Sequence, residues 1–437
     1  MSPAVTEAGA RRQAEFDVKS LFFAYFSLVG AMSPYLGLYF ADWGLSISQI
    51  SLLLAMPQLM RVVAPPFWGA WADRSAKRAG LLRISALGTL LAVGLIALAR
   101  GHYGWLLPLV CLLYFFTAAQ GPIAESMALA AARGEAGVYG RMRQWGSIGF
   151  ILAVAAAGPL LDWLGVRWLV ALLALLALGV LGVSWRVARR AVPVVASAVA
   201  RGTEGATAPP GPSSPPGATA PLGATAPPGA SASPRPIWRR LREPRLALFF
   251  LSCALMMFAH AALYAFYSLY LDRHGYAKTW IGAVWTLGVI AEIALFRWQH
   301  GLFARFGALS LLAFSMAVAA LRFALIGWGD GHWAIVLVSQ LMHAVTFGVH
   351  HSASMALLHQ WFAPGEQGRA QALYATLAYG VGGSAGGLAA GWWWEQVSPA
   401  WAFYCAAIAA ALGWLAVAAS QRFEYAETPT NVRSGTR

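Results

Sequence analysis

Four ionisable side chains interrupt stretches of this sequence that are otherwise apolar enough to cross a lipid bilayer: Arg61, Glu125, Glu292 and Arg322. A charged side chain at the centre of a bilayer costs about 2.5–3.5 kcal/mol on insertion scales, so such residues are retained where they line a path for ions or substrates. A carboxylate can carry a proton and a guanidinium group can hold an anion. The four residues therefore predict a polar route through a membrane and not a simple membrane anchor.

A set of membrane-spanning helices must position these residues. The chain of 437 residues is 59% hydrophobic and only 11% charged, whereas about 25% of the residues are charged in a typical soluble domain. Apolar segments of about 20 residues, the length that crosses a bilayer, predict an all-α membrane protein with twelve transmembrane helices. They lie at 18–41, 47–70, 81–99, 104–132, 142–161, 167–187, 245–271, 279–299, 308–328, 332–358, 369–394 and 400–420.

The net charge of +14 follows the predicted topology. With both termini in the cytoplasm, most of the 31 lysines and arginines fall in cytoplasmic segments. Only Arg100, Arg167, Arg273 and Lys278 lie in the loops on the other side. This asymmetry is the positive-inside rule, so the charge predicts an orientation in the bilayer and not nucleic-acid binding. We therefore expect a multi-pass protein of a bacterial inner membrane.

A segment rich in proline, alanine and glycine divides the chain. Eleven of the 23 prolines lie between Pro193 and Pro236, and the pentamer Gly-Ala-Thr-Ala-Pro occurs there three times. Such sequence cannot bury enough apolar surface to offset the entropy of ordering it. The predicted organisation is an N-terminal six-helix bundle at 1–187, a disordered cytoplasmic linker at 188–243, a C-terminal six-helix bundle at 244–422 and a cytoplasmic tail at 423–437.

The two halves repeat one another. Gly44 and Arg61 of the first half are matched by Gly275 and Glu292 of the second half at a constant offset of 231 residues. The tetrapeptide Ser-Met-Ala-Leu also occurs in both halves. These matches indicate duplication of a six-helix unit. Parallel six-helix halves that bind substrate and ions at the midplane between them are one known transporter architecture.

The loop after the second predicted helix contains a motif, GAWADRSAKR at residues 69–78. A glycine, an Asp-Arg pair and a basic doublet at this place resemble the loop signature of the major facilitator superfamily. Ala76 departs from that signature, which has glycine there, and the matching loop of the second half keeps an arginine but lacks the acid. The resemblance implies a gating motif that consists of Gly69, Asp73, Arg74, Lys77, Arg78 and Arg305.

Longer stretches resemble the phenylpropionate permease-like branch of that superfamily, which is related to the lactose and nucleoside proton symporters. These stretches cover nearly the whole chain except the linker. They are PPFWG at 65–69, GRMRQWGSIGF at 140–150, GVIAEIALF at 288–296, HAVTFGVHHSASMALL at 343–358 and the glycine-rich segment 367–391. The resemblance implies two pseudo-symmetric six-helix bundles that expose a central site to each side of the membrane in turn.

The resemblance also implies roles for charged residues. Proton symporters of the lactose-permease type have an acid on the eighth helix, an arginine on the ninth and a histidine on the tenth, where this chain has Glu292, Arg322 and His343. A fourth-helix acid near a fifth-helix arginine grips the substrate in that fold, and Glu125 with Arg143 resembles this pair. No second carboxylate follows the histidine on the tenth helix, so Glu292 or Glu125 must carry the proton.

The chemistry of these residues leads to the same hypotheses and to their alternatives. Desolvation favours a protonated carboxyl group and a nearby arginine favours the ionised form, so rearranging Glu292 and Arg322 would change the acid's affinity for a proton. The alternative is a static ion pair. Arg61 can hold a carboxylate substrate through two hydrogen bonds, or it can pair with Glu125. Aromatic residues expected to line the cavity are Tyr35, Tyr39, Trp145, Tyr264 and Tyr267.

The predicted function is proton-coupled uptake of a small organic solute, with an aromatic or other monocarboxylate such as phenylpropionate favoured. The alternatives are a nucleoside or sugar proton symporter and a drug or metabolite exporter of the same superfamily. We expect no enzyme, because no nucleophile stands beside a histidine–acid pair. We expect no cofactor and no metal, because His343 and His350 share a helical face without supporting acids. The expected partners are the solute, protons and the lipid bilayer, and the protein is expected to be a monomer.

Overall fold

The computed structural model describes residues 3–74, 78–190 and 237–427. Within these residues, eleven helices are long and apolar enough to cross a membrane. The predicted span at 369–394 is not among them, although it is helical. It consists of α13 (Pro364–Tyr374), the π-helical η4 (Ala375–Gly383) and α14 (Ser384–Gln396), which follow one another without a break. Its many glycines make it less apolar than the other spans. The predicted all-α membrane fold is confirmed.

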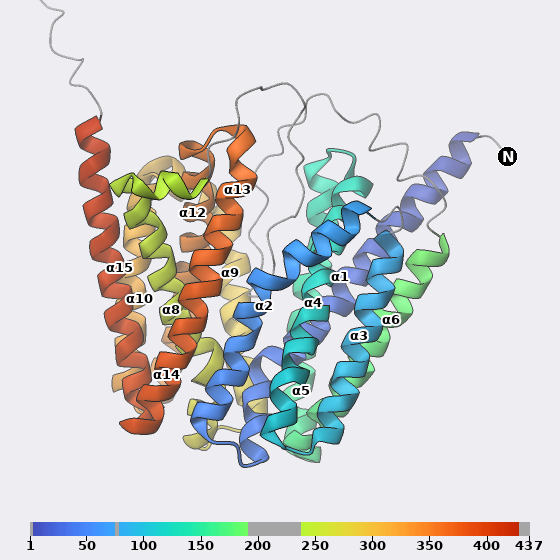
Figure 1. The fold of residues 1–437 in the computed structure, drawn as a ribbon, viewed down its shortest axis with the longest axis horizontal. Helices are drawn as coiled ribbons and strands as arrows, with labels where there is room; N and C mark the ends of the chain where they lie inside the picture. The colour runs from blue at the N-terminus through green and yellow to red at the C-terminus, as the bar shows by residue number, and fades with distance from the viewer. Residues whose placement is uncertain (1–2, 75–77, 191–236, 428–437) are drawn as a thin grey trace, which may run out of the picture.

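The first half consists of six long helices. They are α1 (Pro3–Asp42), α2 (Ile47–Arg74), α3 (Arg78–Ala99), α4 (Tyr103–Ala132), α5 (Ala136–Leu164) and α6 (Leu169–Arg190), with the short η1 (Val166–Trp168) before α6. Helix α1 packs against α5 and α6, and α3 packs against α4 and α6. Helix α2 contains Pro57, Pro65 and Pro66. Prolines inside a helix remove backbone hydrogen bonds and bend it, and α2 changes direction along its length in Figure 1.

The second half begins with the short η2 (Ile237–Arg242). It continues with α8 (Pro244–Arg273), α9 (Lys278–Phe306), α10 (Ala308–Trp328), α11 (Trp333–His343), the π-helical η3 (Ala344–Val349), α12 (His350–Trp361), the α13–η4–α14 run and α15 (Pro399–Glu427). Both α8 and α10 pack against α15. Helix α6 and η2 extend into the predicted linker at 188–243, of which 191–236 lie outside the described residues. Helix α15 runs past the predicted boundary at residue 422.

The turns of the two halves share backbone geometry. Gly44 and Gly275, which match in the sequence repeat, have φ angles of 78° and 81°. The left-handed region that these angles occupy favours glycine, since a Cβ atom is crowded there. The turns 100–101 and 330–331 likewise each pair a left-handed non-glycine residue with a left-handed glycine. Corresponding chain reversals are therefore built in the same way in both halves.

Among the described residues, the halves meet mainly where α2 packs on η4 and α14, α5 on α9, and α1 on α8. Smaller contacts join α1 to α9 and α2 to α8. The start of α1 and the end of α15 lie on one side of the molecule, at the top of Figure 1. We call the opposite side, which contains the turns at 42–47, 164–169, 273–278 and 396–399, the distal face. The α5–α9 and α2–α14 pairs meet there.

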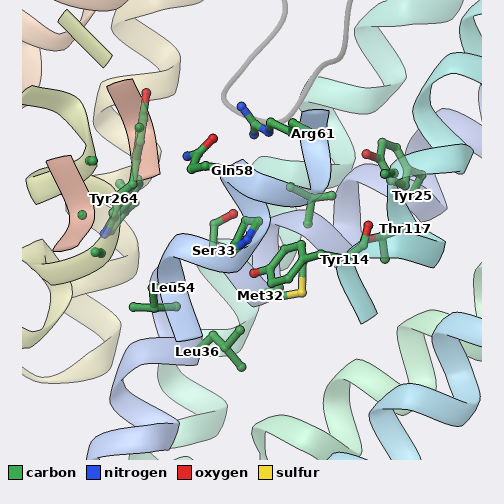
Figure 2. A pocket seen from close by; sticks show the side chains of 18 residues that line it. Tyr25, Met32, Ser33, Leu36, Leu54, Gln58, Arg61, Tyr114, Thr117 and Tyr264 are labelled. Atoms are coloured by element: carbon green, nitrogen blue, oxygen red, sulfur yellow. The ribbon is translucent and has the colours of Figure 1, made fainter. Parts of the chain in front are cut away.

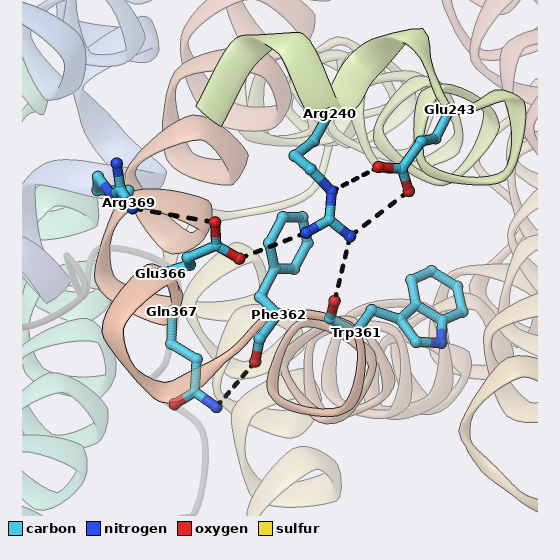
Figure 3. A network of polar contacts seen from close by, with 7 residues as sticks. All are labelled: Arg240, Glu243, Trp361, Phe362, Glu366, Gln367 and Arg369. Atoms are coloured by element: carbon cyan, nitrogen blue, oxygen red, sulfur yellow. Dashed lines mark hydrogen bonds and ion pairs between the residues drawn. The ribbon is translucent and has the colours of Figure 1, made fainter. Parts of the chain in front are cut away.

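On the side opposite the distal face, Arg240 fixes the start of the second half (Figure 3). Its Nε atom lies 2.6 Å from Glu243 Oε1, and its Nη1 atom lies 3.3 Å from Glu366 Oε2 on α13. Its Nη2 atom donates to the carbonyl oxygen of Trp361 at 3.5 Å. These contacts hold η2 to the turn between α12 and α13, so the chain is anchored where it enters the second bundle.

Glycines let α14 pack directly on the backbone of α8. A Cβ atom at Gly386 would overlap the carbonyl oxygen of Phe258, whereas a Cβ atom at the neighbouring Gly387 would meet no described atom within 4 Å. We therefore expect Gly386→Ala to destabilise the protein by about 1–3 kcal/mol, the usual cost of overpacking. Gly387→Ala should be neutral or slightly stabilising. Thermal unfolding of both purified variants tests this, and equal melting temperatures would contradict the close approach.

Candidate functional site

A cavity of about 130 Å³ lies between the two halves (Figure 2). Helices α1, α2 and α4 of the first half line one side, and α8, α9, η4 and α14 line the other. The polar part of the lining comes from Tyr25, Ser33, Gln58, Arg61, Tyr114, Thr117 and Tyr264, and the larger apolar side chains are Val29, Met32, Leu36, Leu54 and Trp285. The cavity therefore combines a cationic polar region with an apolar and aromatic wall.

Arg61 is the one charged side chain in this lining, and it reaches toward the second half. Its guanidinium carbon lies 5.2 Å from the centre of the Tyr379 ring on η4. Among the described residues, no carboxylate forms an ion pair with Arg61. The cation is therefore held by an aromatic face and retains its capacity to bind an anion.

Glu125 pairs inside the first half, and its partner is not Arg61. Its Oε1 atom accepts a hydrogen bond from Arg143 Nε at 3.1 Å, and its Oε2 atom accepts one from the Tyr139 hydroxyl at 2.6 Å. Glu125 and Arg143 are both buried, and the guanidinium carbon of Arg143 lies 4.4 Å from the centre of the Phe26 ring. None of these side chains belongs to the cavity lining. The structure thus brings Glu125 and Arg143 together, but their side chains do not line the cavity.

Glu292, His343 and Arg322 form a buried row in the second half. Arg322 Nη1 donates a hydrogen bond to His343 Nδ1 at 3.1 Å, and His343 Nε2 lies 4.0 Å from Glu292 Oε2. In the described part of the chain, neither carboxylate oxygen of Glu292 has a hydrogen-bond partner. The sequence predicts that Glu292 and Arg322 form a pair, but in the structure the imidazole ring of His343 lies between them.

The hydrogen bond from Arg322 fixes the tautomer of His343. A guanidinium group only donates, so Nδ1 accepts and the proton of the neutral ring lies on Nε2, toward Glu292. Arg322 Nη1 also donates to Thr346 Oγ1 at 2.9 Å. The Thr346 hydroxyl lies 3.3 Å from His260 Nε2. His260 Nδ1 must donate to the carbonyl oxygen of Met256 at 3.0 Å, which leaves Nε2 free to accept from Thr346.

Sequence reasoning missed His260 and Thr346. His260 had the same signal as the four charged residues, an ionisable side chain inside an apolar span, and it is fully buried. Thr346 had no such signal, because it lies in η3, the π-helical turn that starts directly after His343. Such π-helical turns are rare and are frequent at functional sites, but their position cannot be seen in residue types.

Only one of the five predicted aromatic residues, Tyr264, lines the cavity. Tyr35 donates to the carbonyl oxygens of Val154 and Lys278, and the Tyr267 hydroxyl bonds to that of Ser339. Tyr39 packs on Trp43, and the partly exposed Trp145 packs on Phe23. Their residue type favoured a cavity, but the angular position of each on its helix directs it elsewhere. Lining residues that the sequence did not single out include Gln58, Tyr114 and Thr117.

The predicted gating motif is only partly described. Arg74 is exposed at the end of α2, and Arg305 is exposed at the end of α9, 5.2 Å from the centre of the Phe306 ring. Gly69 lies in the last turns of α2 and is half-buried. The side chains of Asp73 and Arg78, and all of Lys77, lie outside the described residues. The gating role stays a prediction.

Comparisons with known proteins agree with this architecture. The sequence model of the MFS_1 like family matches residues 16–405. The chain is 27% identical over 365 residues to the probable 3-phenylpropionic acid transporter of Escherichia coli (strain K12), covering 82% of this chain and 86% of that protein. It is 33% identical over 163 residues to the maltose permease of Geobacillus stearothermophilus, covering 37% of this chain and 41% of that protein. The crystal structure of the nucleoside transporter NupG matches with a TM-score of 0.76 at 16% identity, covering 94% of this chain and 99% of that one.

Proposed function

This chain belongs to the MFS_1 like family and is therefore a multi-pass membrane transporter and not an enzyme, and from that premise we propose that it couples proton entry to the uptake of a small organic monocarboxylate. An aromatic acid such as phenylpropionate is the favoured solute. The transporter exposes the cavity between its halves to each side of the membrane in turn. The distal face is the outer face of a bacterial inner membrane, both termini are cytoplasmic, and a monomer carries out the cycle.

Arg61 is the observation that carries the proposal. A carboxylate can accept two parallel hydrogen bonds from a guanidinium group, and Arg61 is the cation in the cavity lining that has no acid paired with it among the described residues. The wall beyond it contains Met32, Leu54 and Trp285, which suit an apolar or aromatic body. An anionic head with an apolar body is the chemistry of an aromatic monocarboxylate.

Glu292 is the proposed proton carrier. A carboxylate that is buried without hydrogen-bond donors is costly when ionised and much less so when protonated. Glu292 is 2% exposed and its oxygens have no partner among the described residues, while the Nε2–H group of His343 is 4.0 Å away. A small shift of His343 toward Glu292 would supply a donor to the ionised form. The Arg322–His343 pair is thus suited to control when Glu292 releases its proton.

A continuous row of side chains links the cavity to the proton carrier. Tyr264 lines the cavity and its ring lies 5.8 Å from that of His260. His260 is joined through Thr346 to Arg322, and Arg322 bonds to His343 beside Glu292. A solute that moves Tyr264 therefore disturbs the same hydrogen bonds that orient His343, which gives solute binding a physical route to the proton site.

Proton flux driven by solute tests the proposal directly. The purified protein is reconstituted into liposomes that contain a pH-sensitive dye, and 3-phenylpropionate is added outside. The expected result is acidification of the lumen that depends on the solute concentration and saturates. Flux with a nucleoside or with maltose, and none with the carboxylate, would favour the alternative symporters. Solute movement without any proton flux would contradict the coupling.

A further inference from the structure

The start of α9 is capped by an acid from the other half of the molecule. Asp162, near the end of α5, accepts hydrogen bonds from the backbone N–H groups of Lys278 and Thr279, both at 2.8 Å, and from the Thr279 hydroxyl at 2.6 Å. The preceding residue, Ala277, makes no side-chain cap. The first backbone N–H groups of a helix need acceptors from outside the helix, and here the first half supplies them to the second.

The start of α2 is capped in the same way in the opposite direction. Glu395, near the end of α14, accepts a hydrogen bond from the backbone N–H of Ser48 at 3.1 Å and another from the Ser48 hydroxyl. Ser48 is the second residue of α2. Each half therefore supplies an acid from its fifth long helix to the N-terminus of the second long helix of the other half.

These two contacts are related by the internal repeat. Ser48 and Thr279 match at the offset of 231 residues that relates the halves, and Asp162 matches Glu395 at an offset of 233. Each acid also follows a glycine by four residues, Gly158 and Gly391, so the glycine and the acid share a helix face. A Cβ atom at Gly158 would come within 2.6 Å of the Lys278 carbonyl oxygen, and one at Gly391 would overlap the Ser51 side chain. In each case the glycine leaves room for the partner helix, and the acid four residues later caps the N-terminus of that helix.

We propose that Asp162 and Glu395 are paired gate residues that hold the distal face closed and must both release before the cavity opens on that side. This inference rests on the alternating-access cycle proposed above. The side chains of both acids are exposed at the rim, so water can replace the backbone N–H groups when the halves separate. Opening also moves each negative charge away from a helix N-terminus. This costs free energy, because a helix N-terminus stabilises a negative charge. The hydrogen bonds of Asp162 and Glu395 therefore stabilise the closed state and are lost when the distal face opens.

The two contacts differ in how much the capped helix depends on them. Helix α2 has its own capping box, in which Ser46 and Gln49 bond to each other's backbone N–H groups at 3.2 and 3.0 Å. The matching residues before and in α9 are Ala277 and Trp280, which supply no such bonds. The contact made by Asp162 is therefore the stronger of the two, and its removal should open the distal face more than removal of the Glu395 contact.

Hydrogen exchange of the full-length protein in lipid nanodiscs, followed by mass spectrometry, tests the proposal without measuring transport. Asp162→Ala should speed exchange at Lys278 and Thr279 about tenfold, the size expected for a lost cap. A gate predicts a comparable increase at Ser48, which Asp162 does not contact, because the whole face opens. Glu395→Ala should act on Lys278 and Thr279 in return, with a smaller change.

Asp42→Ala is the matched control, since Asp42 is an acid of the distal face that pairs with Arg167 inside the first half. It should leave exchange at Ser48, Lys278 and Thr279 unchanged. Thr279→Val removes one hydrogen-bond donor to Asp162 and keeps the acid, so it should speed exchange at the same sites less than Asp162→Ala does. It serves as the test variant if Asp162→Ala does not fold. An increase confined to α9, or no increase, would overturn the gate and leave the proposed solute and proton sites untouched.

Discussion

Replacing Glu292 with glutamine is expected to abolish proton-driven accumulation of the solute while exchange of solute across the membrane continues. Glutamine keeps the size and polarity of the side chain but carries no titratable proton. A gradient of one pH unit stores about 1.4 kcal/mol per proton, enough for about tenfold accumulation at one proton per solute. The variant should bring the solute only to equal concentrations inside and outside. Uptake of labelled solute into proteoliposomes with an imposed pH gradient measures this ratio.

Glu15→Gln is the control for this substitution. Glu15 forms ion pairs with Arg11 and Lys19 along α1, at 3.5 and 3.6 Å, and does not line the cavity. Its replacement should leave the accumulation ratio at the wild-type value. Counterflow, in which unlabelled solute inside drives labelled solute inward, should survive in both variants. Undiminished accumulation by Glu292→Gln would show that another group carries the proton, and Glu125 would then be the next candidate.

Replacing Arg61 with glutamine is expected to weaken binding of a carboxylate solute about 30-fold, or by about 2 kcal/mol, the range of hydrogen bonds to charged groups. The neutral amide of the same compound should bind the variant and the wild type with similar affinity. Arg61→Lys keeps the charge but not the planar fork, so it should recover part of the loss. Tryptophan fluorescence or calorimetry on the purified protein measures these affinities.

The comparison between acid and amide separates charge recognition from general damage to the cavity. Arg297→Gln serves as the control, because Arg297 is an exposed arginine of α9 outside the cavity lining. It should change neither affinity. An equal loss for acid and amide in Arg61→Gln would remove the carboxylate assignment. It would favour an uncharged solute such as a nucleoside or a sugar.

The sequence was sufficient to predict the fold, because each span is set by the thickness of the bilayer and by local apolarity. The apolar signal was weaker for the eleventh predicted span, at 369–394, because its glycines lower its apolarity. The structure nevertheless forms a helix there. Of the four charged residues that suggest a polar route, Arg61 lines the cavity, and Glu125, Glu292 and Arg322 are buried; their part in transport stays a prediction. Because a charged side chain in hydrocarbon is costly, a charged residue inside an apolar span is predicted to face the protein interior or a cavity.

The partners of those charges could not be predicted in the same way. Whether Arg61 meets Glu125 or Tyr379 depends on the bend of α2 and on how the halves meet, which residue spacing does not determine. The insertion of His343 between Glu292 and Arg322 depends on where the π-helical turn η3 begins. The contacts of Asp162 and Glu395 were also missed, because each acid lies at the end of an apolar span and only the docked halves reveal what it caps.

Part of the cavity wall is bare backbone, since Gly383 and Gly387 line it without side chains. The space beside Gly387 is open, so alanine or serine there would fill volume without moving a helix. Gly386, the preceding residue, has no such freedom, because a Cβ atom there would overlap the carbonyl oxygen of Phe258. Single substitutions at position 387 would therefore shrink the proposed solute cavity, and with it the size of molecule that fits, while position 386 stays fixed by packing.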